Sequence, residues 1–168
     1  HKKIFMNAAS PGVISLFLSN AYYSNRNEYL DAIASAMQEE YETIVNAGIQ
    51  LQLDCPDLAL SRHMTFKNES DEDFIKIANH NMEILNESLK NIPSNKLRLH
   101  VCWGNYEGPH IHDISIEKIF EVLMSFKGDY LLFESSNPRH QHEWEIFEKL
   151  KSKIPENKIL IPGVLDTT

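Results

Sequence analysis

The sequence predicts an α/β fold in which five strands form a parallel sheet. Short apolar or alternating runs recur along the chain, and long amphipathic segments separate them. These segments are long enough to be helices that carry the chain back across a sheet, so successive strands are expected to run parallel. A doubly wound sheet and a (β/α)₈ barrel both fit this pattern. A barrel needs eight units and typically ~250 residues, so these 168 residues would form about five-eighths of one.

In the first half of the chain, capping residues mark the ends of two expected helices. Asn27 is the expected N-cap of the first helix, and Gly48 stands at its C′ position. Ser70 with Asp73 forms a capping signature for the second. The expected elements are a strand at 3–7, a turn at 10–12, a helix at 28–47, a strand at 49–55 and a helix at 71–90.

The second half repeats the pattern with three more strands. Residues 97–103 alternate strictly, whereas 130–134 are almost continuously apolar, which is typical of a strand covered on both faces. The expected elements are strands at 97–103, 130–134 and 158–161, a helix at 116–126 and a short helix around 144–150. No linker or internal repeat interrupts the chain, so residues 1–168 are expected to form a single domain.

Composition excludes several classes of protein. With 42% hydrophobic and 24% charged residues, the chain is neither disordered nor collagen-like. A net charge of −8 argues against nucleic acid or an anionic membrane as partner. The sequence shows no apolar run of ~20 residues and no signal-peptide pattern, and the two cysteines are too few for a disulfide scaffold. We therefore expect a cytoplasmic protein. The chain starts at His1 without an initiator Met and ends without a closing helix, so a longer parent protein is expected.

The strand at 97–103 carries a possible metal motif. Alternation sends Arg98, His100 and Cys102 to one side of the strand. The Cα atoms of His100 and Cys102 would lie about 6 to 7 Å apart, and both side chains could reach one Zn²⁺. The alternative is a hydrogen-bonded core histidine beside an inert buried cysteine.

Acidic residues end two other strands. Glu134 follows the apolar run at 130–133, and Asp54 ends the strand at 49–55 on the side of Gln50 and Gln52. Active sites of barrels and open parallel sheets collect their groups at these strand ends. Either acid could instead cap a helix or bond within a loop. Because three consecutive strands end in chemically capable side chains, a metal or polar site is favoured.

The remaining candidates are weaker. His110 and His112, like His140 and His142, fall in loops after strands, where they could touch a substrate or simply be solvated. Cys55 falls on the apolar side of its strand and is expected to be a core residue. The acidic run at 71–73 is expected to complement the dipole of the helix that it begins.

Together these motifs carry a resemblance. In order, residues 51–57 (LQLDCPD), His100–Val101–Cys102, Glu134 and residues 162–166 (PGVLD) resemble the C-terminal catalytic barrel of cobalamin-independent methionine synthases. The stretches at 100–110 and 137–144 resemble the single-barrel, methionine synthase II-like branch. The resemblance implies a (β/α)₈ TIM barrel of the methionine synthase/uroporphyrinogen decarboxylase type, here incomplete and covering its central to C-terminal portion.

The resemblance also implies roles for individual residues. His100 and Cys102 match the zinc ligands of the H-x-C motif, and Glu134 matches the glutamate ligand. Asp54 matches the acid that contacts the amino group of homocysteine. The fourth ligand of the family is a cysteine expected beyond Thr168. The family's catalytic histidine aligns with Thr168, so the catalytic acid is left unassigned.

The expected function is a zinc-dependent methyltransferase that converts homocysteine to methionine. The donor is expected to be of the 5-methyltetrahydrofolate type, as in 5-methyltetrahydropteroyltriglutamate–homocysteine methyltransferase. One alternative is a zinc-dependent alkyltransferase on another thiol, similar to epoxyalkane:coenzyme M transferase. Another is a catalytically incomplete barrel fragment or binding module. Asp54 favours an amino-acid thiol, because a carboxylate suits an ammonium group.

Overall fold

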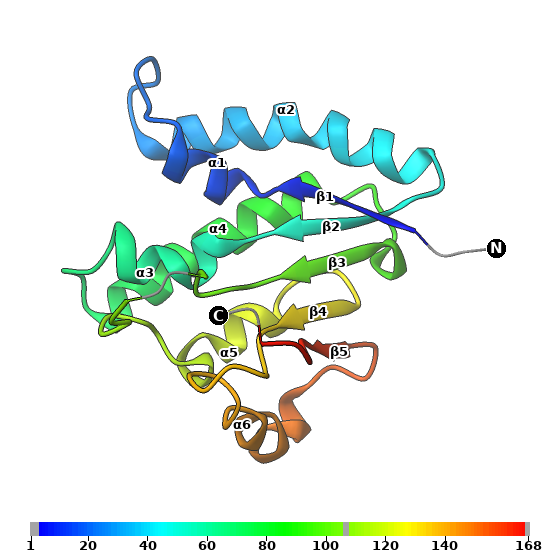
Figure 1. Ribbon diagram of the computed structural model, residues 1–168. Helices are drawn as coiled ribbons and strands as arrows, with labels where there is room; N and C mark the ends of the chain where they lie inside the picture. The colour runs from blue at the N-terminus through cyan, green and yellow to red at the C-terminus, as the bar shows by residue number, and fades with distance from the viewer. Residues whose placement is uncertain (1–3, 106–107, 167–168) are drawn as a thin grey trace.

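A computed structural model describes residues 4–105 and 108–166. Its centre is a five-stranded sheet in which all neighbouring strands are parallel, as the sequence predicts (Figure 1). The strands follow one another across the sheet in chain order. They are β1 (Phe5–Ala9), β2 (Gln50–Asp54), β3 (Leu97–His100), β4 (Tyr130–Phe133) and β5 (Ile159–Pro162).

Six α-helices and three short 3₁₀ helices are described between the strands. The two longest helices and the helix after β3 lie where the sequence predicts them. The α-helices are α1 (Pro11–Phe17), α2 (Arg26–Asn46), α3 (Leu60–Met64), α4 (Asp71–Ser88), α5 (Ile116–Met124) and α6 (Trp144–Lys149). The 3₁₀ helices are η1 (Pro56–Leu58), η2 (Ser94–Lys96) and η3 (Lys151–Lys153).

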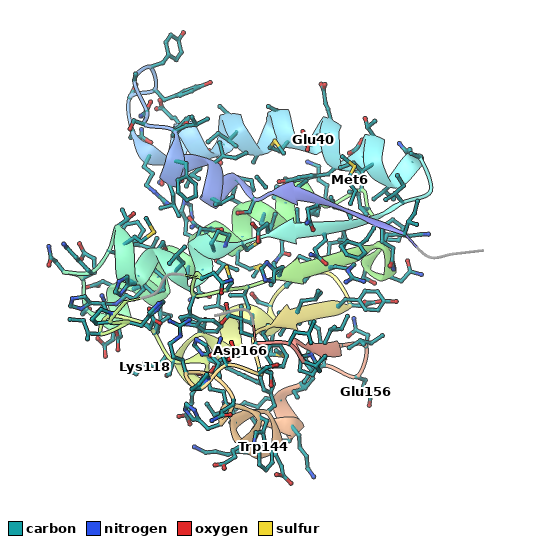
Figure 2. All side chains as sticks on the ribbon, viewed as in Figure 1. Met6, Glu40, Lys118, Trp144, Glu156 and Asp166 are labelled. Carbon is teal, nitrogen blue, oxygen red and sulfur yellow. The ribbon has the colours of Figure 1, made fainter. Side chains whose placement is uncertain are left out.

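The sheet has one face covered by helices. Leu51, Leu53 and Leu99 are fully buried there and belong to the main core. Figure 1 shows α4 and α5 behind the sheet. Figure 2 shows Met6 of β1 near α2, and Met6 and Glu40 of α2 line a shallow groove between the two elements. The residues that alternate with these leucines, such as Gln52, Arg98 and His100, lie on the opposite face. The sequence-ordered strands lack the reversal of order that marks doubly wound sheets.

The start of the chain corrects two expectations. Residues 10–12 begin helix α1 and are not a turn. Ser10 caps this helix by accepting the N–H of Val13, and Pro11 occupies a first-turn position that needs no N–H donor. The preceding strand accordingly ends at Ala9 and not at Asn7.

Side-chain hydrogen bonds identify the N-caps of the two long helices. Asn25, and not Asn27, caps α2 by accepting the N–H of Glu28. Gly48 follows the helix with φ +83°, as predicted for a C′ glycine. Ser70 caps α4 by accepting the N–H of Asp73, and the acidic run at 71–73 occupies the first turn, as predicted.

Among the described helices, none combines the length and apolar character needed to cross a membrane.

Candidate metal centre

Asp54, His100 and Cys102 come together where β2 and β3 end. One ligand atom from each of them lies within 4.8 Å of the others. The sheet register causes this, because Asp54 pairs with His100 in the parallel ladder. Backbone bonds continue beyond the strands: the N–H of Cys55 donates to His100 O at 2.9 Å, and that of Leu60 to Cys102 O at 3.2 Å. These bonds keep Cys102 beside the end of β2.

The Asp54 carboxylate contacts one nitrogen of the His100 ring. Asp54 Oδ1 lies 2.6 Å from His100 Nδ1. An ionised carboxylate only accepts hydrogen bonds, so Nδ1–H donates to it, and in the neutral form of the ring Nε2 is then the acceptor. A carboxylate bonded to the far nitrogen is the usual arrangement behind a metal-binding histidine. The pair therefore has the geometry of an oriented ligand.

Cys102 lies beside this pair and is partly buried. Burial raises the pKa of its thiol to about 11, and the negative charges of Asp54, Glu134 and Asp57 act in the same direction. Without a cation the thiol is therefore protonated at neutral pH. A divalent metal reverses this balance, because it binds thiolate and releases the proton.

Glu134 lines the same cavity as His100 and Cys102, although it lies outside their close cluster with Asp54. The cavity has a volume of about 390 Å³. Asn137 donates a hydrogen bond from Nδ2 to Glu134 Oε2. Much of the remaining wall is apolar and comes from β4, β5 and the segment after β5: Leu132, Phe133, Ile161, Pro162 and Leu165.

The two predicted histidine pairs are not among the described residues that line this cavity. His110 Nδ1 lies 2.7 Å from Asp113 Oδ2, and its ring stacks on His63 with centroids 5.3 Å apart. His112 is tilted against His63. Their contact with a substrate stays a prediction.

The second pair belongs to the loop after β4. His140 is buried, with Nδ1 2.9 Å from Glu143 Oε2 and its ring centroid 4.4 Å from that of Trp103. His142 is exposed. A role for either in substrate binding also stays a prediction.

Two polar residues near the site are not predicted from the sequence, and the first is Asp57. Its carboxylate is fully buried and accepts bonds from Ser10 Oγ at 2.6 Å and Asn81 Nδ2 at 2.9 Å. Burial raises its pKa to about 6, against the effect of these bonds and of Arg26. The second is Asn137. No periodic pattern marks either residue: the side-chain partners of Asp57 are distant in the sequence, and Asn137 lies in an irregular loop.

Cys55 is fully buried in the main core, as predicted from its side of the strand. Burial raises the pKa of its thiol well above the ordinary range. The chain therefore holds two cysteines in different settings: Cys55 in the core and Cys102 at the cavity.

Comparison with known proteins gives distant relatives. No family model matches the chain. Proteins named methionine synthase from Saccharolobus islandicus and Saccharolobus solfataricus are 28% identical to it over 112 residues. The match covers 65% of this chain and 30% of each relative. The chain thus aligns with under a third of the length of these relatives, and the similarity connects it only loosely to methionine synthases.

Proposed function

We propose that this chain belongs to a zinc-dependent enzyme that transfers a methyl group to a thiol, with homocysteine as acceptor and methionine as product. The observation that carries the proposal is that the His100 imidazole and the Cys102 thiol come together beside Asp54 at the ends of adjacent strands, in a cavity that Glu134 also lines. The distant similarity to proteins named methionine synthase supports the same reaction class.

His100, Cys102 and Glu134 are the proposed zinc ligands. Nitrogen and sulfur donors of this kind suit zinc and disfavour Mg²⁺ and Ca²⁺, which prefer all-oxygen sites. The residues fit such an ion: His100 keeps Nε2 as its acceptor, and the buried Cys102 thiol lies among carboxylates that a cation would offset. Glu134 lines the same cavity as both.

The cavity supports binding of a small thiol. Zinc held by these ligands would act as a Lewis acid that lowers the pKa of the acceptor thiol, and thiolate is the competent nucleophile. Asp54 uses Oδ1 for His100, which leaves Oδ2 for the ammonium group of homocysteine. Leu132 and Ile161 provide apolar wall for its methylene groups and reduce access of water. The attacking sulfur takes the methyl group, and the departing donor nitrogen takes up a proton from an acid that is not assigned.

A (β/α)₈ barrel of the methionine synthase/uroporphyrinogen decarboxylase type is the proposed complete architecture. Sequential parallel strands with helices on one face are the arrangement of barrel β/α units, whereas a doubly wound sheet reverses its strand order. The candidate ligands lie at the carboxyl ends of the strands, where barrels carry their active sites.

The decisive experiment compares the two cysteines. The full-length protein that contains this chain is purified, loaded with zinc and dialysed; its metal content is then measured, and homocysteine methylation is assayed with a methyltetrahydrofolate donor. We expect about one zinc per chain, lost together with turnover in Cys102→Ser. Cys55→Ala is the matched control and should keep both. A Cys102→Ser protein that retains metal and turnover would show that the ligand assignment is wrong.

The lining of the cavity favours a second candidate function. Because Asp54 is not among the described residues that line the cavity, a thiol without an ammonium group would also fit there. The protein would then be a zinc-dependent alkyltransferase that opens an epoxide with a thiol such as coenzyme M. Parallel assays of homocysteine with a methyl donor and of coenzyme M with an epoxide separate the two functions.

A further inference from the structure

Asn137 makes three side-chain hydrogen bonds in the loop after β4. It is 6% exposed. Its Nδ2 donates to Glu134 Oε2, and its Oδ1 accepts the N–H groups of Arg139 and His140, both at 3.1 Å. The orientation of the amide is fixed by these partners, because a flipped amide would set oxygen against carboxylate and NH₂ against two N–H donors.

This loop is attached to the neighbouring parts of the fold. The N–H of His140 also donates to Asn137 O, and its ring packs against Trp103, the residue after Cys102. His140 Nδ1 contacts Glu143, whose other oxygen accepts the N–H of Ile116 at the start of α5. A continuous series of contacts therefore runs from the Glu134 carboxylate to the segment that carries Cys102.

These contacts restrain the Glu134 side chain. Among the described residues, Asn137 is the hydrogen-bond donor to its carboxylate, and it engages Oε2 only. Because the bond to Oε2 already restricts the Glu134 side chain, less rotamer entropy would be lost when the other carboxylate oxygen binds a cation. Supporting residues of this kind decide whether a ligand is held in productive geometry.

We propose that Asn137 is a positioning residue, which holds the Glu134 carboxylate ready to act as a ligand in the cavity shared with His100 and Cys102. The inference rests on the proposed zinc site. Asn137 would then have two roles: it accepts the loop N–H groups of Arg139 and His140, and it positions Glu134. Two substitutions separate these roles.

Asn137→Asp separates positioning from loop structure. The aspartate keeps an oxygen for the N–H groups of Arg139 and His140, so the loop is retained. It loses the donor to Glu134 and places a like charge beside it. Asn137→Ala removes both functions. Gln141→Ala, at an exposed position of the same loop, is the control.

The test uses metal ions alone on the purified full-length protein. Zinc affinity is measured by competition with a chromophoric chelator, the visible spectrum is recorded with Co²⁺, and the melting temperature monitors folding. We expect zinc affinity to fall about 10- to 100-fold in Asn137→Asp and in Asn137→Ala. The Co²⁺ spectrum should change in both, whereas Gln141→Ala should match wild type. The melting temperature of Asn137→Asp should stay closer to wild type than that of Asn137→Ala.

Two results would overturn the proposal in distinguishable ways. If wild type holds zinc and Cys102→Ser loses it, but Asn137→Asp binds zinc and Co²⁺ as wild type does, Asn137 is only a loop cap and the proposed function stands. If wild type binds no zinc, the proposed function and the role of Asn137 both fail.

Discussion

Asp54 and His100 lie side by side across β2 and β3, with Oδ1 of the acid 2.6 Å from Nδ1 of the imidazole. Both side chains remain partly open to solvent, at 47% and 34% exposure. The contact is therefore too exposed to stabilise the fold strongly. Its main effect is to fix the ring orientation and tautomer of His100, which leaves Nε2 available to a metal ion.

This relationship predicts how Asp54 variants behave. Asp54→Ala frees the imidazole, and zinc affinity should fall about 10- to 100-fold. Asp54→Asn keeps an oxygen that can accept from Nδ1–H, so its loss should be smaller. Chelator competition measures both. If Asp54 acts only on the substrate ammonium group, zinc affinity will be unchanged and only the KM for homocysteine will rise.

Cys102 should react slowly with alkylating reagents in the metal-free protein. With its pKa raised to about 11, about one thiol in a thousand is thiolate at pH 8. Alkylation by iodoacetamide in the metal-free protein should therefore be far slower than that of a free cysteine and should accelerate as pH rises. Zinc addition in weak buffer should release a proton from the thiol.

The control for this measurement is Cys102→Ser, which should lose the slow alkylation and the proton release. Cys55 is inaccessible in the core and should not react in the folded protein. Rapid alkylation of Cys102 at neutral pH without metal would contradict the predicted burial effect.

Much of the fold is predictable because it depends on local pattern. Alternation at 97–103 predicts that His100 and Cys102 share a side, and parallel strands predict that Asp54 and His100 end at one edge. The caps are less predictable. Asn27 is as good a capping residue as Asn25, but its Oδ1 lies 3.2 Å from His80 Nε2, a residue 53 positions away.

The supporting residues of the site are not marked by a sequence pattern. Asp57 is buried because Ser10 and Asn81, 47 and 24 positions away, provide its hydrogen bonds. The side-chain bonds of Asn137 are local, but they lie in an irregular loop that has no periodic pattern. Its proposed role follows from the position of its partner Glu134 in the cavity. Sequence patterns predict candidate ligands at strand ends, but not the residues that hold them.

Gly12 should tolerate no side chain. A Cβ there would lie 1.9 Å from Asp57 Oδ2 and 2.8 Å from Asn81 Nδ2, both within a buried network. Gly12→Ala must displace these groups, so we expect a loss of about 3 kcal/mol or more in unfolding free energy. Gly163→Ala is the control, because its Cβ would meet its nearest atom at 3.4 Å. Urea denaturation measures both, and equal stability of the two variants would contradict the close packing of Gly12.

Asp57 should make stability depend on pH in the acidic range. Its pKa is about 6 in the folded protein, above the ordinary 3.8, so the folded state holds the proton more tightly. The resulting stabilisation is fully present below pH 3.8 and is lost as pH rises through 6. The difference between the two pKa values corresponds to at most about 3 kcal/mol.

Asp57→Asn is the variant that isolates this effect. Its side chain imitates the neutral acid: the oxygen can accept from Asn81, and the NH₂ group can donate to Ser10 Oγ if that hydroxyl turns. The unfolding free energy of both proteins is measured by urea denaturation between pH 4 and 7. In the difference between the two, the contributions of the other titrating groups cancel. We expect the stability of Asp57→Asn relative to wild type to rise across this range and to level off near neutral pH. Parallel stability curves would mean that Asp57 is already ionised at pH 4, with its charge fully offset by Ser10, Asn81 and Arg26.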